Sequence, residues 1–128
     1  MLLYKSLLLV DDDVDDHEIF MAALENISSD VDLKTAENGL KALQLLRQKA
    51  VTPELIFLDI NMPLMNGFQF LSELKKQDGL KDIPVIMYST TSAPEAIEQA
   101  KQTGAIDFIS KPENFSELEL VLQRILYK

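Results

Sequence analysis

The stretch LIFLDINMP, residues 55–63, lies near the middle of the chain and decides its fold. Its first four residues form an unbroken apolar run with the length of a buried strand. Runs without alternation are typical of parallel strands that are covered on both faces of a sheet. A single carboxylate, Asp59, ends the run. The stretch therefore predicts a central strand of a parallel sheet, with an acidic side chain at its carboxyl end.

Similar apolar runs occur on both sides of this stretch, and segments with helical spacing separate them. The predicted strands are Ser6–Val10, Val31–Thr35, Leu55–Leu58, Val85–Tyr88 and Ile106–Ile109. The predicted helices are Asp15–Asn26, Gly39–Gln48, Gly67–Lys76, Pro94–Thr103 and Ser116–Tyr127. Parallel strands joined by helices form a doubly wound sheet with right-handed crossovers. The chain is therefore predicted to be an α/β domain with a five-stranded parallel sheet and five helices.

Local signals predict some helix ends and helix faces. Ser92 is a possible cap before Pro94, and Gly104 is a good left-handed terminator. Ser116 and Glu119 have the spacing of a capping box. The stripe expected to face inward on the first helix consists of Ile19, Ala22, Ala23 and Asn26, with Phe20 and Leu24 beside it.

Composition bounds the possible functions. The 128 residues fit one domain, and no second domain is expected because the sequence ends with the fifth predicted helix. The chain has no cysteine, which excludes disulfides and is compatible with the cytoplasm, where we expect the protein to work. A net charge of −9 argues against binding to nucleic acid. The longest apolar run, Leu7–Val10, is far too short to span a membrane, so no membrane partner is expected.

Polar residues directly follow four of the five predicted strands. In a doubly wound sheet the carboxyl ends of the strands border the ligand-binding crevice, so these residues are expected to converge. They are Asp11, Asp12 and Asp13, then Asp59, then Ser89, Thr90 and Thr91, and finally Ser110, Lys111 and Pro112. No comparable group follows the second strand, which indicates an edge position.

The chemistry of this set suggests phosphoryl transfer. Several carboxylates in one crevice repel each other unless some are protonated or a cation lies among them. Mg²⁺ suits the set because it takes one or two carboxylates together with water and phosphate oxygens. A carboxylate can also act as a nucleophile, and Asp59 is the best candidate because it stands alone at the tip of a buried strand. Lys111 and Ser89 offer donors to phosphoryl oxygens.

Each segment taken alone has a simpler interpretation. Residues 11–16 fit a solvated acidic loop, but not a calcium loop, because Asp16 and Ala22 stand where Gly and Glu are required. Residues 59–63 fit a turn, and residues 89–92 fit a loop rich in helix caps. The only histidine, His17, is predicted to be a surface residue. The joint occurrence of the polar groups after four strands disfavours these separate interpretations.

The same residues resemble the receiver domain of two-component response regulators, in particular the stand-alone chemotaxis regulators. The resemblance covers almost the whole chain. It rests on LVDD at residues 9–12, LDINMPLMNG at 58–67, IMYS at 86–89 and the pair Lys111-Pro112. It implies a flavodoxin-like fold with strand order 2-1-3-4-5. It also implies a non-enzymatic phosphoacceptor switch formed by a single receiver domain over residues 1–128.

The resemblance assigns roles to individual residues. Asp59 is implied as the phosphoacceptor, with a sensor histidine kinase or a histidine phosphotransfer protein as donor. Asp12 and Asp59 are implied to bind Mg²⁺, or Mn²⁺ in its place, with Asn61 through its backbone carbonyl and Asp11 through water. Ser89 and Lys111 are implied to contact phosphoryl oxygens. Asp13, Asp15 and Asp16 receive no metal role and are expected on a solvated or protein-binding face.

The resemblance also implies an output surface, formed by the fourth helix, the fifth strand and the fifth helix. Ser89 would move toward the phosphoryl group, and Phe108, where the family often has Tyr, would turn inward. Thr90 stands where many members have Ala, so its bulk is expected to narrow access to the site. A cis peptide bond is implied between Lys111 and Pro112.

Two other functions remain open at the level of the sequence. One is a receiver-like interaction module that works without phosphate. The other is a phosphatase of the aspartyl-phosphate kind, which usually needs a second Asp two residues after the nucleophile. Asn61 occupies that position and cannot transfer a proton.

Overall fold

Five parallel strands form one sheet in the computed structural model, which describes residues 1–128. The strands are β1 (Ser6–Val10), β2 (Asp32–Ala36), β3 (Leu55–Leu58), β4 (Val85–Ser89) and β5 (Asp107–Ser110). Their order in the sheet is β2-β1-β3-β4-β5, and every neighbouring pair is parallel. The predicted fold and strand order are therefore confirmed, with β3 in the centre.

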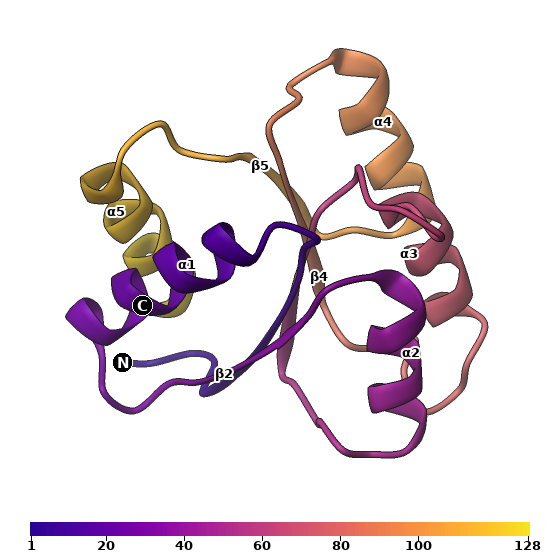
Figure 1. The fold of residues 1–128 in the computed structure, drawn as a ribbon, viewed down its shortest axis with the longest axis horizontal. Coiled ribbons are helices and arrows are strands. Elements are labelled where there is room, and N and C mark those ends of the chain that lie inside the picture. The colour runs from indigo at the N-terminus through magenta and orange to yellow at the C-terminus, as the bar shows by residue number, and fades with distance from the viewer.

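Helices cover both faces of this sheet. They are α1 (Val14–Ile27), α2 (Gly39–Arg47), α3 (Gly67–Lys75), α4 (Pro94–Thr103) and α5 (Phe115–Leu126). Helices α1 and α5 lie together on one face, and α2, α3 and α4 lie on the other (Figure 1). This three-layer arrangement buries both faces of the central strands, which explains their unbroken apolar sequences.

Two hydrophobic cores result, one on each face. Alternate residues of β1 divide between them: Leu7 and Leu9 pack toward α1 and α5, while Leu8 and Val10 pack toward α2, α3 and α4. The core under α1 and α5 contains three aromatic rings in edge-to-face contact, with centroids 5.0 to 6.2 Å apart. These rings belong to Phe20, Phe57 and Tyr88. Tyr88 thereby connects this core to the end of β4.

The edge strands differ from their predicted bounds by one residue. Both β2 and β5 begin and end one position later than the apolar runs suggest. Each is only partly buried, because an edge strand has one free side and a more exposed face. The apolar pattern is therefore a weaker guide to their ends than it is for β1 and β3, whose bounds match, while β4 ends one residue later than predicted, at Ser89.

Several local predictions about the helices are wrong. The buried residues of α1 are His17, Phe20, Ala23 and Leu24, whereas Ile19 is 46% exposed. The N-cap of α4 is Ala93 rather than Ser92, and it makes no side-chain capping bond. For α5, the side chain of Asn114 accepts a hydrogen bond from the backbone N–H of Glu117, so the cap precedes Ser116. In contrast, Gly104 ends α4 in the left-handed conformation, as predicted.

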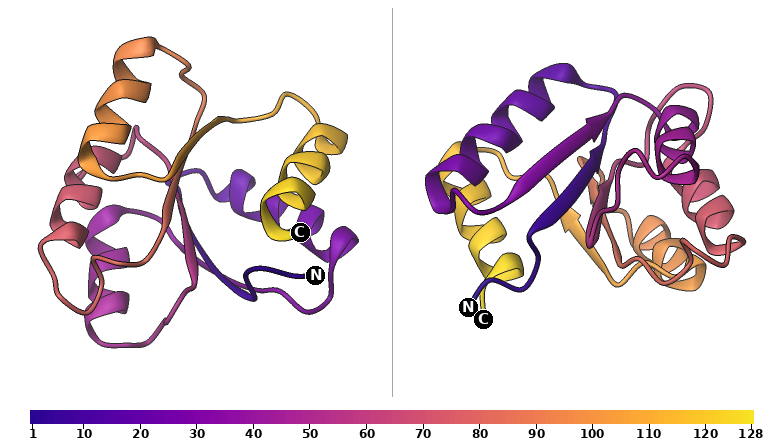
Figure 2. Two further views of the ribbon diagram at one scale, coloured as in Figure 1. Left: turned by 180° about the vertical axis from the view of Figure 1, so that it is seen from behind. Right: turned by 90° about the horizontal axis from the view of Figure 1, so that it is seen from below.

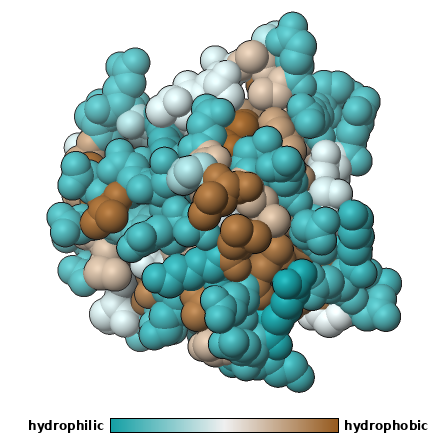
Figure 3. Space-filling model, turned by 45° about the vertical axis from the view of Figure 1, so that its right-hand side comes forward, coloured by the Kyte–Doolittle hydropathy of each residue, from teal (hydrophilic) through white to brown (hydrophobic).

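The outer surface over α2, α3 and α4 is mostly hydrophilic with apolar patches (Figure 3). Two exposed apolar side chains on this side of the sheet are Leu40 of α2 and Leu64 in the loop between β3 and α3. Leu64 also has a positive φ of 71°. No helix is both long enough and apolar enough to cross a membrane.

The first and last residues lie side by side (Figure 2). Leu2 and Tyr127 form an antiparallel bridge, and the backbone N–H of Leu3 donates to the carbonyl of Leu126 over 2.6 Å. Because β1 starts and α5 ends here, both termini lie at the amino end of the sheet, opposite the carboxyl ends of the strands.

Candidate phosphoacceptor site

Asp11 directly follows β1 and is fully buried. Its backbone N–H donates to the carbonyl of Ala36, so the β1–β2 pairing continues one residue past the strand. Its Oδ1 accepts a hydrogen bond from the backbone N–H of Asp13 over 3.0 Å. Asp13 in turn caps α1 by accepting from the backbone N–H of Asp15. The turn from β1 into α1 thus fixes the position of the Asp11 carboxylate.

Asp59 follows β3 in the same way. Its backbone N–H donates to the carbonyl of Val10, and its Oδ1 accepts from the backbone N–H of Ile60 over 2.8 Å. Gly67 closes the loop by donating its N–H to the carbonyl of Ile60. A Cβ atom at position 67 would lie 2.3 Å from the backbone oxygen of Asp59, so only glycine allows this close approach.

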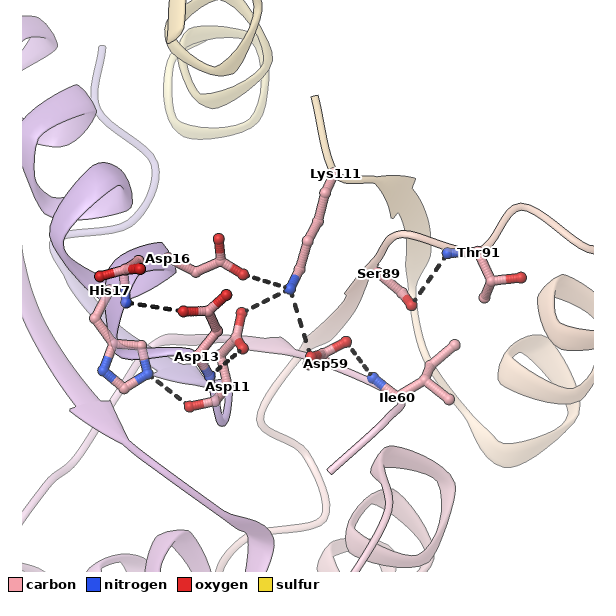
Figure 4. Close-up of polar contacts among 10 residues, drawn as sticks. Asp11, Asp13, Asp16, His17, Asp59, Ile60, Ser89, Thr91 and Lys111 are labelled. Atoms are coloured by element: carbon pink, nitrogen blue, oxygen red, sulfur yellow. Dashed lines mark hydrogen bonds and ion pairs between the residues drawn. The ribbon is translucent and has the colours of Figure 1, made fainter. Parts of the chain in front are cut away.

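Lys111 follows β5 and brings its ammonium group among three carboxylates (Figure 4). The distance from Nζ is 2.7 Å to Asp16 Oδ2, 2.9 Å to Asp11 Oδ2 and 3.4 Å to Asp59 Oδ2. The Lys111 backbone N–H donates to the carbonyl of Ser89, which fixes the base of the side chain. The structure therefore brings together residues that are separated by as many as 100 positions in the chain.

Burial and charge act against each other at this cluster. Burial raises the pKa of Asp11 to about 6, although the Asp13 N–H and Lys111 partly offset this effect. Burial likewise raises the pKa of Asp59, again against the attraction of Lys111. For Lys111, burial disfavours the charged form, but the hydrogen bond to Asp16 and the negative charge of Asp11 outweigh this effect and raise the pKa. The carboxylates are thus held in an environment that favours an additional cation.

Three carboxylates form a group suited to a divalent cation. Oxygen atoms of Asp11, Asp12 and Asp59 all lie within 4.8 Å of one another. Asp11 Oδ2 is buried and accepts no directed hydrogen bond; it faces the Lys111 ammonium only as an ion pair. Carboxylate oxygens are the preferred ligands of Mg²⁺ and related hard cations. The donor set and the free lone pairs therefore fit a divalent metal.

An open crevice leads to this cluster. Its walls come from the loops after β1, β3, β4 and β5, as the convergence of polar residues predicts. It is lined by Asp12, Asp13, Val14, Asp16, Asp59, Asn61, Thr90, Lys111, Pro112 and Glu113. Asp11 and Ser89 do not line it and have no exposed surface. The predicted site residues thus form a wall with two buried side chains behind it.

The hydroxyl residues are less connected to the cluster than the acids are. The Ser89 Oγ accepts a hydrogen bond from the backbone N–H of Thr91 over 3.4 Å, and it turns away from Asp59 (Figure 4). Thr90 is exposed and lines the crevice, in line with its expected position at the entrance. Phe108 is half-buried and packs against the core under α2, α3 and α4.

Two residues near the cluster have positions that the sequence did not indicate. His17 is only 9% exposed, so the predicted surface position is wrong. Its Nε2 lies 2.6 Å from the backbone oxygen of Asp11, and Nε2 carries the proton because a carbonyl only accepts. Asp16 pairs with Lys111 rather than lying on a solvated face. Both lie in the first turn of α1, which directly follows the end of β1.

The peptide bond between Lys111 and Pro112 is trans, as are all others, so the expected cis bond is contradicted. The trans form is the more stable isomer even before proline, by about 0.5–1 kcal/mol.

Comparisons with known proteins agree with this geometry. The family model for the response regulator receiver domain matches residues 7–123. The two-component response regulator ORR3 of Oryza sativa subsp. japonica is 32% identical over 121 residues, which cover 94% of this chain and 90% of that protein. Other curated relatives are longer, and the chain spans 26% and 31% of two of them.

Solved structures give the same result. The phosphorylated cyanobacterial phytochrome response regulator RcpA is 31% identical, with a TM-score of 0.87 over 95% of this chain and 91% of that one. The Mn²⁺-bound form of response regulator Rcp1 is 28% identical, with a TM-score of 0.84 over 94% and 91% of the two chains. Matched in sequence over residues 7–123 and in fold throughout, the chain belongs to the family of response regulator receiver domains.

Proposed function

We propose that Asp59 accepts a phosphoryl group and that its phosphorylation switches the binding of a partner protein. The observation that carries this proposal is the placement of the Asp59 carboxylate. It is held by the Ile60 N–H on one oxygen, faces Lys111 with the other, and borders an open crevice. Such a carboxylate is oriented for attack and accessible to a donor.

The donor is a phosphohistidine of a sensor histidine kinase or of a histidine phosphotransfer protein. A carboxylate oxygen of Asp59 attacks the phosphorus atom, and the bond between phosphorus and the donor imidazole nitrogen breaks. The electron pair of that bond stays on the imidazole nitrogen, which then takes a proton from solvent. The product is an acyl phosphate on Asp59, and no group of this chain has to transfer a proton.

Mg²⁺ is the metal that we assign to the site, with Mn²⁺ as a substitute. Asp12 and Asp59 would hold it through their side chains, Asn61 through its backbone carbonyl and Asp11 through water. When bound, it offsets the negative charge of the phosphoryl oxygens. The cluster of Asp11, Asp12 and Asp59 supports this assignment, and the Mn²⁺-bound form of Rcp1 supports the substitute.

Lys111 and Ser89 contact the phosphoryl oxygens after transfer. Lys111 already faces Asp59, whereas Ser89 has to exchange its hydrogen bond with the Thr91 N–H for one with the phosphoryl group. That exchange is the step that communicates phosphorylation to β4 and β5. Phe108 follows by turning further inward, and the surface formed by α4, β5 and α5 then changes its affinity for a partner protein.

Incubation with acetyl phosphate and Mg²⁺, followed by intact mass measurement, tests the proposal. We expect the gain of one phosphoryl group, its loss in Asp59→Asn, and no gain when the metal is chelated. Lys111→Ala should retain some labelling but lose the effect of phosphate on partner binding. Absence of labelling, when a known receiver is labelled in parallel, would contradict the proposal and favour an interaction module that works without phosphate. The cytoplasmic location and the single-domain organisation stay predictions.

A further inference from the structure

The shortest contact of the Lys111 ammonium is with Asp16, not with the proposed phosphoacceptor. Nζ lies 2.7 Å from Asp16 Oδ2 and donates a hydrogen bond to it. The contact with Asp59 Oδ2 is 3.4 Å, at the long end of hydrogen-bonding distance. Within the cluster, the ammonium is therefore held most closely by the carboxylate that comes from α1.

An ammonium group has three N–H donors. Three carboxylates surround that of Lys111, namely Asp11, Asp16 and Asp59. The proposed phosphoryl group is carried by Asp59 itself, whose contact with Nζ is the longest of the three. Lys111 can therefore move toward that group only by lengthening its contact with Asp11 or with Asp16.

Asp16 is the partner whose release costs least. Asp11 has no exposed surface, so it would lose its cation without gaining water. The side chain of Asp16 is 27% exposed and lines the crevice, so water can solvate its carboxylate. The Asp16 carboxylate and the incoming phosphoryl group are both negative, and both would contact the same ammonium group. Like charges that share a cation compete for it.

We propose that Asp16 is a positioning residue that retains Lys111 at the mouth of the crevice and so weakens the hold of the site on a phosphoryl group at Asp59. This inference rests on the proposed function and adds a regulatory contact to it. When an anion occupies Asp59, Lys111 leaves Asp16 and moves the short distance toward the anion. Asp16 thus stabilises the protein without a phosphoryl group on Asp59 relative to the phosphorylated protein.

Binding of beryllofluoride, a stable mimic of the phosphoryl group on a carboxylate, gives an equilibrium test. The protein is titrated with beryllofluoride at saturating Mg²⁺, and the bound fluorine signal is followed by ¹⁹F NMR. We expect Asp16→Asn to bind about three- to tenfold more tightly than the wild type, because loss of a partly exposed ion pair releases Lys111. Asp16→Ala should behave in the same way, and Asp16→Glu should return the affinity toward that of the wild type.

Asp15→Asn is the matched control for charge. Asp15 lies beside Asp16 in the first turn of α1, is exposed, and makes no ion pair. The substitution Asp15→Asn removes the same charge without touching Lys111. The affinity of this variant for beryllofluoride should therefore differ from that of the wild type by less than twofold, because screened surface charges have small effects. Thermal unfolding of each variant checks that the fold is intact.

The outcomes separate this inference from the proposed function. Tighter binding in Asp16→Asn and Asp16→Ala but not in Asp15→Asn supports it. Equal affinities in wild type, Asp16→Asn and Asp15→Asn would overturn the inference and leave the proposed function intact. Weaker binding in Asp16→Asn would also overturn it, because Asp16 would then be helping Lys111 to reach the anion. If the wild type and Asp59→Asn both fail to bind beryllofluoride, the proposed function is wrong and the inference fails with it.

Discussion

The two sides of the crevice differ in how far they are assembled. The acidic side is formed by Asp11, Asp12, Asp16, Asp59 and Lys111, and all of its carboxylates except Asp12 already contact the one ammonium group. On the hydroxyl side, formed by Ser89, Thr90 and Thr91, the one buried hydroxyl is turned toward the backbone of its own loop. The difference fits the proposed function, in which the acidic groups that would carry out the chemistry are already in position and Ser89 has to move.

The acidic side lowers the stability of the fold. Buried carboxylates with raised pKa values reduce the free energy of unfolding at neutral pH, because they are charged there and are less well solvated than in the unfolded chain. A hydroxyl with a weak hydrogen bond imposes no comparable cost. The following predictions test this contrast through stability, from the largest expected effect to the smallest.

The largest effect is expected at Asp11. In the absence of divalent metal, Asp11→Asn should raise the free energy of unfolding at pH 7 by about 2 kcal/mol, because it removes a buried charge whose pKa is shifted to about 6. The Asn side-chain oxygen can still accept from the Asp13 N–H. Urea unfolding in the presence of a chelator measures the change. A loss of stability would show that the ion pair with Lys111 outweighs the burial of Asp11.

His17 is expected to have the next largest effect. His17→Phe removes the donor to the Asp11 carbonyl and should cost about 1–2 kcal/mol, the usual penalty for an unsatisfied buried acceptor. His17→Gln keeps an N–H donor on a side chain of moderate length and serves as the control. The two variants and the wild type are compared by urea unfolding in one buffer. If both lose the same free energy, the hydrogen bond to Asp11 is not the cause.

A smaller effect is expected from pH. Because the folded-state pKa of Asp11 lies above its ordinary value of 3.8, the folded protein takes up this proton first as the pH falls. The contribution of Asp11 to stability should therefore increase by about 1 kcal/mol between pH 7 and pH 5, and level off only below the ordinary pKa of 3.8. The measurement is the difference in unfolding free energy between wild type and Asp11→Asn without metal. That difference should shrink as the pH falls, and a constant difference would contradict the raised pKa.

The smallest effect is expected on the hydroxyl side. Ser89→Ala removes a single hydrogen bond of 3.4 Å and should change the free energy of unfolding by less than about 0.5 kcal/mol. Chemical unfolding in the same buffer gives the value, and Ser89→Thr tests whether added volume matters. A cost as large as the gain in Asp11→Asn would remove the contrast between the two sides.

The sequence predicts the bounds of the fully buried strands well. It predicts less well which side chains of a helix are buried, because that depends on packing and on single hydrogen bonds. The unbroken apolar runs gave β1 and β3 their bounds, and the polar residues after four strands converge as predicted. In α1, Ala23 and its neighbours Phe20 and Leu24 are buried as predicted, but the apolar Ile19 is exposed and the polar His17 lies inside. Its burial depends on one hydrogen bond to a carbonyl, which leaves no trace in an apolar pattern.

Asp16 was missed for a related reason. In a row of acids, the sequence does not distinguish the carboxylate that meets Lys111 from those that face water. A helical turn places Asp16 toward the crevice, while its neighbour Asp15 is exposed. The predicted caps at Ser92 and Ser116 failed because Ala93 takes the first cap position without a side-chain bond, and Asn114 takes the second with its own side chain. The predicted end of α4 at Gly104 is correct, because it depends only on the left-handed conformation of that one residue.

The pairing of the two chain ends has a practical consequence for building reporters. The backbone atoms of Met1 and Lys128 are already hydrogen-bonded to each other, so a short linker could join them without bending β1 or α5. The chain could then be reopened at an exposed turn such as the one between α1 and β2, giving a circular permutant with the same sheet. The linker between the joined ends lies at the amino end of the sheet. A fluorescent domain inserted into this linker would therefore leave the mouth of the crevice clear for a phosphodonor protein.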